Sequence, residues 1–424
     1  MNRPLAVLTA LVLVAAPGSA ADAPRSVIKL SVQVPAAAGR DVPVCAKIDL
    51  PPAMKGVDIE KASVTMTSGD TRLPGQIVLR GKQADLWWVM PEASPGTASW
   101  TAAVSAEPGE RTDTFRFRDA PGKHLDLLFA GRPVTRYMYA LDRSSKERIF
   151  ETYKPYHHVF DATGKDVITK DAHGHDPHHR GIYIGWGKTT CGGTSYNFWS
   201  MGRGEAQAHR EFLTLAAGPV LGRMVSRVEW IGKDGTVVVA ERREATCFRQ
   251  SARGGLLLME FRSDLTAVAG DVTLDANPEH GGFQYRAHND VAVNVGAARG
   301  KQTADRAPED LKTIYAFHRD GIKTSGQSLK DNKDLPWAAQ CAAIRDKRYS
   351  VQHLNHPSNP SPTVYSAYRQ YGRFGAFFKT TITKGKTLAL VYRIYAAEGT
   401  MPPREEMNRR HAAFVTPPVA TVVK

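Results

Sequence analysis

Hydrophobic and polar residues alternate along much of this chain with a period near two, which is typical of β-strands. Residues 26–34 (Ser-Val-Ile-Lys-Leu-Ser-Val-Gln-Val) are the clearest early case, and similar short runs continue to residue 104. Turn-forming Pro and Gly residues separate these runs. The pattern predicts a small β-sandwich of immunoglobulin-like type at residues 25–119.

Longer alternating segments follow in the rest of the chain. Residues 225–231 and 236–247 flank Lys233-Asp234-Gly235, which is a strong hairpin signal. Helix signals are sparse, and the best candidate lies at residues 403–414. We therefore expect an all-β fold with a large antiparallel β-sandwich at residues 120–400. A short helix and a Pro-rich tail are expected to follow at residues 401–424.

The N-terminus has the pattern of a secretory signal. A basic start at Arg3 precedes an apolar run over residues 5–16, then Pro17-Gly18 and the small residues Ser19 and Ala20. The run is too short for a transmembrane helix, and no later segment reaches about eighteen uninterrupted apolar residues. We expect a signal peptide at residues 1–20, a periplasmic or secreted mature protein, and no membrane span.

Charge and cysteine spacing narrow the range of partners. The chain has 56 Lys and Arg against 42 Asp and Glu, a formal charge of +14, which favours anionic partners. Export argues against nucleic acid as the partner and leaves acidic glycans or envelope polymers. Alternatively, the charge only keeps the surface of the protein soluble. The four cysteines are Cys45, Cys191, Cys247 and Cys341, and they form no CxxC pair, so a structural zinc knot is not expected. Three disulfide connectivities between them are possible.

A histidine-rich segment is the strongest sign of chemistry. Four of the fourteen histidines fall within residues 173–179, a density that suits metal binding, proton transfer or hydrogen bonding. The alternative is that these histidines are merely exposed on a loop. His173 and His175 would share one face of an extended segment and could bind a divalent metal. His178 and His179 follow a proline and are expected to point to opposite sides. Further ligands could come from His157, Asp171 or Asp176, and proton transfer from His175, His178 or His179.

Other side chains suit the binding of a sugar. Arg180 stands beside the imidazoles and could receive a carboxylate or a pair of hydroxyls. Trp186 and Trp199 could stack on a pyranose ring, although each is equally suited to a core. Glu205 is a candidate acid or base. Arg286, near the Gly281-Gly282 turn, and Asn359, in the Asn- and Pro-rich loop, are further candidates for binding the substrate. Tyr156 and Arg369 are candidates as well.

Four motifs in this order resemble a large bacterial family of exported proteins called PmoA-like, which has no established function. They are Asp176-Pro-His-His-Arg-Gly181, Phe198-Trp199, Gly281-Gly-Phe283 with Arg286, and Asn355-His-Pro-Ser-Asn-Pro360 with Arg369-Gln-Tyr-Gly372. The resemblance covers about residues 125–400. The label suggests a subunit of methane monooxygenase, but that membrane enzyme needs several transmembrane helices. The resemblance instead implies exported carbohydrate degradation, and the sandwich is expected to be similar to the galactose-mutarotase-like supersandwich.

We conclude from the sequence that the chain is an exported carbohydrate-active enzyme. It is expected to hydrolyse, eliminate from or epimerise a glycoside or uronide, with histidines as acid–base groups and either no cofactor or a divalent metal. Hydrolysis would need two carboxylates, for which the candidates are Glu205, Glu211, Glu260 and Glu279. The alternatives are a non-catalytic glycan-binding protein and a metal-dependent oxidoreductase.

Overall fold

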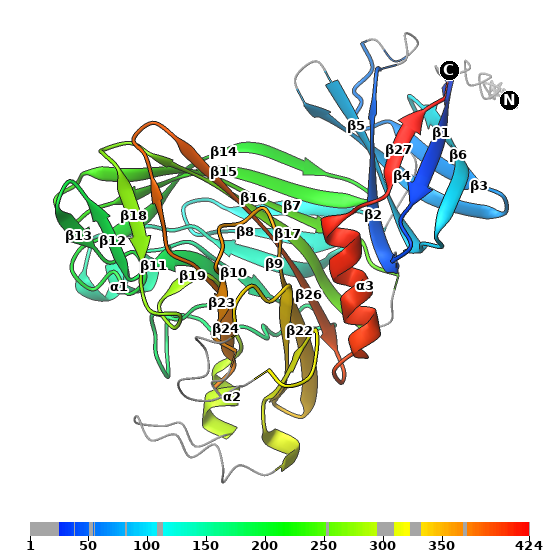
Figure 1. Cartoon of the computed structure of the whole chain (residues 1–424). Coiled ribbons are helices and arrows are strands. Elements are labelled where there is room, and N and C mark those ends of the chain that lie inside the picture. The colour runs from blue at the N-terminus through cyan, green and yellow to red at the C-terminus, as the bar shows by residue number, and fades with distance from the viewer. Residues whose placement is uncertain are drawn as a thin grey trace, which may run out of the picture.

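The computed structural model describes residues 25–37, 39–50, 54, 56–80, 83–107, 113–251, 254–294, 309–322, 332–367 and 371–423. Strands dominate these residues, which confirms the all-β expectation (Figure 1). The described α-helices are short: α1 (Lys146–Thr152), α2 (Asn289–Asn294) and α3 (Arg404–Val415). The predicted signal peptide lies outside the described residues.

The N-terminal unit is a closed barrel with the strand order β1-β27-β2-β5-β4-β3-β6. Six strands come from the N-terminal part: β1 (Arg25–Val34), β2 (Arg40–Ile48), β3 (Ser63–Ser68), β4 (Thr71–Arg80), β5 (Gln83–Glu92) and β6 (Gly96–Ser105). The seventh, β27 (Val419–Val422), comes from the tail and pairs antiparallel with β1 and parallel with β2. The segment expected to be a Pro-rich tail therefore contains a strand that completes this barrel (Figure 1).

The larger unit contains two eight-stranded sheets, which we call the front sheet and the back sheet. The front sheet has the order β23 (Val364–Tyr365), β24 (Arg373–Phe377), β19 (Gly281–Arg286), β11 (Ile182–Trp186), β10 (Tyr156–Val159), β9 (Arg132–Met138), β8 (His124–Phe129) and β7 (Phe115–Ala120). The back sheet has the order β14 (Ala206–Ala217), β15 (Leu221–Ile231), β16 (Val237–Phe248), β17 (Gly255–Ala267), β26 (Thr387–Glu398), β22 (Lys347–Asn355), β21 (Trp337–Ile344) and β20 (Ile314–Phe317). Because β7 already belongs to the front sheet, this unit begins near residue 115, a few residues before the predicted boundary.

A four-stranded sheet covers one end of the larger unit, in the order β13 (Thr194–Tyr196), β12 (Lys188–Cys191), β18 (Val272–Asp275) and β25 (Thr380–Ile382). Aromatic side chains fill the space between the front and back sheets. Phe283 stacks on Phe261 with ring centroids 4.4 Å apart and on Tyr392 at 4.7 Å. The four cysteines all lie in described segments, and none of them forms a disulfide.

The central strands of the front sheet are buried on both faces. Phe283 and Tyr285 of β19 pack into the core between the sheets. Because side chains alternate along a strand, Gln284 and Arg286 point to the opposite face, and both are fully buried there. Loops therefore cover the outer face of the front sheet and enclose a polar layer.

One buried side chain connects the barrel to the larger unit. Gln76 of β4 accepts hydrogen bonds through Oε1 from the backbone amides of Val220 and Leu221, at 3.0 and 2.9 Å. Apolar residues of both units and of α3 pack around this contact, including Val78, Phe248 and Phe414. The orientation of the barrel is thus fixed by polar and apolar contacts together.

We predict that Gln76→Ala lowers the free energy of unfolding by about 2 kcal/mol, because it leaves two buried amides without an acceptor. Urea unfolding followed by tryptophan fluorescence measures this loss. Gln33→Ala, on an exposed position of the same barrel, serves as the control and should change stability by less than about 0.5 kcal/mol. Equal stability of the two variants would contradict the role assigned to Gln76.

A second prediction concerns acid stability. His353 of β22 is buried between the sheets, 3.0 Å from Tyr365 Oη and 3.2 Å from the Phe283 carbonyl oxygen, and burial lowers its pKa from 6.5 to about 3. The unfolded chain therefore binds a proton between these pH values that the folded chain does not, so stability falls as the pH drops below about 6.5. For His353 alone the loss at pH 4.5 is about 2.5 kcal/mol.

Urea midpoints of the wild type and of His353→Gln at pH 7 and pH 4.5 measure this contribution. The variant should lose less stability on acidification than the wild type. His173→Gln, at an exposed histidine, should keep the full wild-type pH dependence. An identical pH dependence in all three proteins would refute the assignment.

Candidate functional site

Two arginines lie side by side on the outer face of the front sheet. Arg286 of β19 is in register with Arg373 of β24, and both side chains are fully buried. Arg373 donates hydrogen bonds to Gln284 Oε1 at 3.2 Å and to Ser366 Oγ at 2.9 Å. The three nitrogens of Arg286, in contrast, have no hydrogen-bond partner among the described residues.

The Arg286 guanidinium faces an aromatic ring. Its carbon lies 4.8 Å from the ring centroid of Tyr371, whose Oη accepts a hydrogen bond from Arg373 Nε at 3.4 Å. Burial lowers the pKa of Arg286 to about 10, which still leaves it charged at neutral pH. A buried charge without a direct ion-pair partner costs several kcal/mol, so this position is suited to binding an anion. We call Arg286, Arg373 and Tyr371 the anion site.

A tight turn brings two histidines beside the anion site. The amide of His179 donates to the Asp176 carbonyl oxygen at 2.9 Å, and Asp176 has a positive φ of 49°. The rings of His178 and His179 lie 4.1 Å apart, and that of His179 lies 6.3 Å from Tyr371. The turn expected after Pro177 is present, but the expectation that the two histidines point to opposite sides is wrong, because this turn brings both rings together.

Gly181 holds this turn against the sheet. Its amide donates to the Lys170 carbonyl oxygen and its carbonyl oxygen accepts from the Arg286 amide, both at 2.8 Å. A Cβ at this position would lie 2.1 Å from the His157 carbonyl oxygen, and the backbone has a positive φ of 41°. Only glycine allows so close an approach.

A third histidine comes from a distant part of the chain. His280 precedes β19, and its ligand nitrogen lies within 4.8 Å of those of His178 and His179. We call these three residues the imidazole trio. The amide of Gly187 donates to the His280 carbonyl oxygen at 2.8 Å, and His280 Nδ1 lies 2.7 Å from Asn277 Oδ1. These contacts fix His280 at the end of β11.

Burial and positive neighbours keep His178 and His179 neutral. Burial lowers the pKa of His178 to about 3 and that of His179 well below its usual value, with nearby cationic groups adding to the effect. Lys154 is also buried, donates to the Trp199 carbonyl oxygen at 2.6 Å, and has its pKa lowered by the same burial. The imidazoles therefore present lone pairs at neutral pH.

A hollow of about 550 Å³, which we call the side hollow, opens beside the trio. Trp199 and His280 form its inner wall, and the Trp199 ring lies 5.5 Å from His179 and 4.8 Å from Tyr183. The remaining lining residues are mostly polar and small: Gly187, Lys188, Asn197, Ser200, Asp275, Ala276 and Asn277. A polar molecule in this hollow would thus meet the trio at His280.

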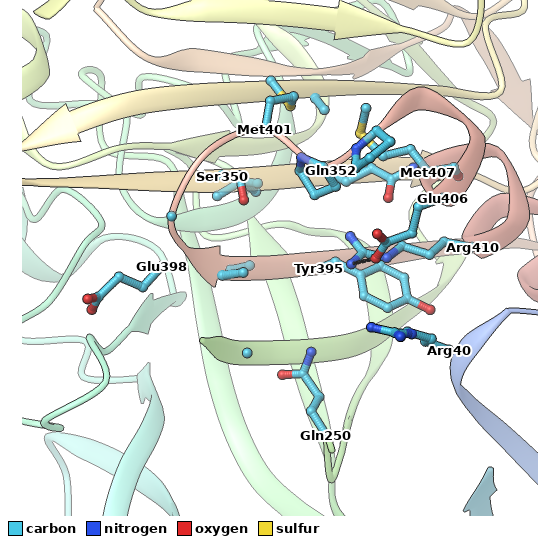
Figure 2. A pocket seen from close by; sticks show the side chains of 18 of the residues that line it. Arg40, Gln250, Ser350, Gln352, Tyr395, Glu398, Met401, Glu406, Met407 and Arg410 are labelled. Atoms are coloured by element: carbon cyan, nitrogen blue, oxygen red, sulfur yellow. Dashed lines mark hydrogen bonds and ion pairs between the residues drawn. The ribbon is translucent and has the colours of Figure 1, made fainter. Parts of the chain in front are cut away.

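A separate hollow of about 740 Å³ lies at the junction of the barrel, α3 and the back sheet (Figure 2). Figure 2 shows Arg40, Tyr395, Glu406 and Arg410 pointing toward one another across it. Its charges are of both signs, and Arg410 donates to Glu406. This junction hollow contains no member of the imidazole trio or the anion site, so we assign the chemistry to the front sheet.

The structure brings several of the predicted site residues together. His178, His179, Trp199 and Arg286 surround the same region, as described above. His175 Nε2 lies 3.2 Å from Asp176 Oδ2, and its ring lies 5.2 Å from Tyr371. Tyr156 is buried in a cluster with Tyr183 and Trp199, so it supports the site from below.

Four predicted residues have structural positions instead. Arg180 donates to the carbonyl oxygens of Pro177 at 3.0 Å, Glu151 at 2.9 Å and Phe150, so its guanidinium positions the loop and is not available to a sugar. Trp186 is fully buried in the core and donates to the Phe378 carbonyl oxygen at 3.0 Å, so it cannot stack on a substrate. The other two form hydrogen bonds with backbone groups. Glu205 accepts from the amides of Asn197 and Arg203 in its own loop, and Asn359 exchanges two hydrogen bonds with the backbone of Val391 on β26.

The predicted metal pair is also replaced by a different set. His173 is 69% exposed and lies 3.4 Å from both Glu151 and Asp171, away from the trio. Among the described residues, the imidazoles that converge are His178, His179 and His280, and not His173 with His175. Arg369 lies outside the described residues.

Sequence reasoning missed several members of the site. His280 and Tyr371 stood within segments that were singled out, but nothing in the spacing marked them individually. Arg373 follows the Arg369–Gly372 motif and shares the alternation of its strand, which could have placed it beside Arg286. Lys154 has no signal in the sequence, because only the fold buries it.

Comparisons with known proteins identify a family. A solved structure titled "Heparinase III-BT4657 gene product" matches with a TM-score of 0.29 and 8% identity over 69% of this chain, which spans 37% of that chain. No curated protein matches this sequence. None of the described helices is long and apolar enough to cross a membrane. A model described as "Family of unknown function (DUF6807)" matches residues 124–412. This description agrees with the expectation that the family has no established function, but it does not mention the PmoA-like family. Because this match includes more than half of the sequence, the chain belongs to the DUF6807 family of unknown function.

Proposed function

We propose that this protein is an exported enzyme that acts on a uronide, a sugar that carries a carboxylate. The observation that carries the proposal is the fully buried Arg286, whose three nitrogens lack a hydrogen-bond partner among the described residues. A guanidinium matches a carboxylate with two parallel hydrogen bonds, which compensates the buried charge. The signal-like pattern at residues 1–20 and the formal charge of +14 support export and an anionic partner.

The chemistry beside Arg286 suits proton transfer next to the bound carboxylate. Binding the carboxylate to Arg286 lowers the cost of removing the proton from C5 of the sugar, because the guanidinium stabilises the negative charge that develops. Tyr371 lies on one side of Arg286, and His175 lies against Tyr371. These two groups are suitably placed to accept a proton and to return one.

The two reactions that use this arrangement are elimination and epimerisation. In elimination the C5 proton goes to a base, its electron pair forms the C4=C5 double bond, and the C4–O bond breaks as the leaving oxygen takes a proton. In epimerisation a proton returns to C5 from the opposite face. Trp199, which was expected to stack on a pyranose ring, is fully buried like Trp186, so it forms a wall of the side hollow and not a stacking surface.

Hydrolysis has less support from the carboxylates. Glu205 accepts loop amides, Glu211 pairs with Arg227 at 3.0 Å, and Glu260 pairs with Arg393 at 2.8 Å. The last two lie on the back sheet, on the opposite layer from the imidazole trio. A pair of carboxylates flanking one bond, as glycoside hydrolysis requires, is therefore not formed by these three.

We predict that Arg286→Gln weakens binding of a 4-linked uronate oligosaccharide by at least about thirtyfold, because it removes the charge that pairs with the carboxylate. Isothermal titration calorimetry measures the affinity, with the neutral oligosaccharide of the same linkage as the ligand control. Arg227→Gln, whose side chain is 52% exposed on the back sheet, should bind as the wild type does. Unchanged affinity of a folded Arg286→Gln protein would overturn the proposed anion site.

We predict that Tyr371→Phe lowers the rate of uronide turnover by about a hundredfold or more while the affinity changes less than about threefold, since the ring stays and only the hydroxyl is lost. Appearance of the conjugated double bond, or of the epimer by NMR, measures turnover. Tyr139→Phe, at a tyrosine whose Oη donates to Asp119 at 2.7 Å, is the matched control. Tight binding without turnover in the wild type would instead indicate a glycan-binding protein.

A further inference from the structure

We propose that His178, His179 and His280 bind one divalent transition-metal ion, for which zinc is the best fit. Their ligand nitrogens lie within 4.8 Å of one another. Three nitrogens about 2.1 Å from a tetrahedral zinc ion are separated by about 3.4 Å, so small side-chain movements are enough to close the site. Such movements are available because none of the three residues lies within a strand: His178 and His179 lie on a loop turn, and His280 directly precedes β19.

Two of the three imidazoles have unsatisfied nitrogens. His178 Nε2 and both nitrogens of His179 are buried and lack a hydrogen-bond partner among the described residues. Leaving a buried polar group unpaired costs about 1–3 kcal/mol, so such groups normally have a partner. Their convergence on one point is what a shared metal ion would explain, because a single ion satisfies the lone pairs of both residues.

The surroundings also resemble those of metal-binding histidines. Such residues usually hold their second ring nitrogen with an oxygen acceptor, which fixes the ring and its tautomer. His280 Nδ1 lies 2.7 Å from Asn277 Oδ1, and this contact orients the His280 ring. His179 Nδ1 lies 3.8 Å from Asp176 Oδ2, which is beyond hydrogen-bond distance.

Ligand type selects the class of metal. Imidazole nitrogens suit zinc, copper, iron or nickel, whereas magnesium and calcium prefer oxygen. Three protein ligands leave one coordination position, as in catalytic zinc sites, and the side hollow borders the trio at His280. Arg286 and Lys154 oppose a nearby cation, but the Asp176 carboxylate, 3.2 Å from His175 Nε2, supplies compensating negative charge.

A metal here would add to the binding of the substrate carboxylate. One carboxylate oxygen would occupy the open metal position while the other is held by Arg286, leaving proton transfer to Tyr371 and His175. This role rests on the proposed function, but the metal site does not, because its ligands converge without any substrate. The two proposals can therefore fail independently.

The test is metal binding by the purified full-length protein. After chelation and dialysis we expect Zn²⁺ to bind with a stoichiometry near one per chain, and Co²⁺ to give the visible absorption of a tetrahedral site. His280→Gln should weaken Zn²⁺ binding at least about a hundredfold, and Asn277→Ala, which leaves all three ligands in place, about tenfold or more. His173→Gln is the matched control and should bind Zn²⁺ as the wild type does.

The outcomes separate the possibilities clearly. No stoichiometric Zn²⁺, Cu²⁺, Ni²⁺ or Co²⁺ binding by the wild type would overturn the metal proposal, as would full affinity in His280→Gln. Loss of binding in His173→Gln instead would place the metal elsewhere. If His280→Gln does not fold, the effect of Asn277→Ala and the Co²⁺ spectrum of the wild type decide. Arg286→Gln should keep its metal while losing uronide binding, so each proposal has its own readout.

Discussion

The feature on which this site depends is a buried guanidinium that has no hydrogen-bond partner among the described residues. Other buried arginines in the chain are paired: Arg243 donates to both oxygens of Glu241, at 2.7 and 2.9 Å, and Arg180 donates to three backbone carbonyl oxygens. Arg286 is as deeply buried but has no such partner among the described residues. Since this fold pairs its structural arginines, the exception points to a ligand.

The scaffold explains how so polar a layer can be buried. The front sheet packs one face on the back sheet through aromatic residues such as Phe283, which leaves its other face available for charged and hydrogen-bonding side chains. Loops from several parts of the chain close over that face, and Gly181 permits the closest of these approaches. The barrel and α3 lie against the back sheet, away from this layer, so they stabilise the larger unit without contributing to the site (Figure 1).

The sequence predicted the fold class well, because alternation with a period of two is a local property of strands. The candidate residues Arg286, His178, His179 and Trp199 lie near one another in the structure. The sequence could not predict that Arg180 and Trp186 are structural, since their directions depend on the covering loops and on sheet packing. His280 joins the trio through the pairing of β11 with β19, a long-range contact that no single segment encodes. The formation of strand β27 also depends on long-range contacts, because its partners β1 and β2 lie at the other end of the sequence.

The central claim is that Arg286 holds the carboxylate of a sugar. The most direct measurement is a crystal structure of the protein with a uronate oligosaccharide bound. We expect one carboxylate to lie about 3 Å from the Arg286 guanidinium nitrogens, beside Tyr371. A carboxylate bound instead in the junction hollow, or a guanidinium solvated only by water while the sugar lies elsewhere, would contradict the account.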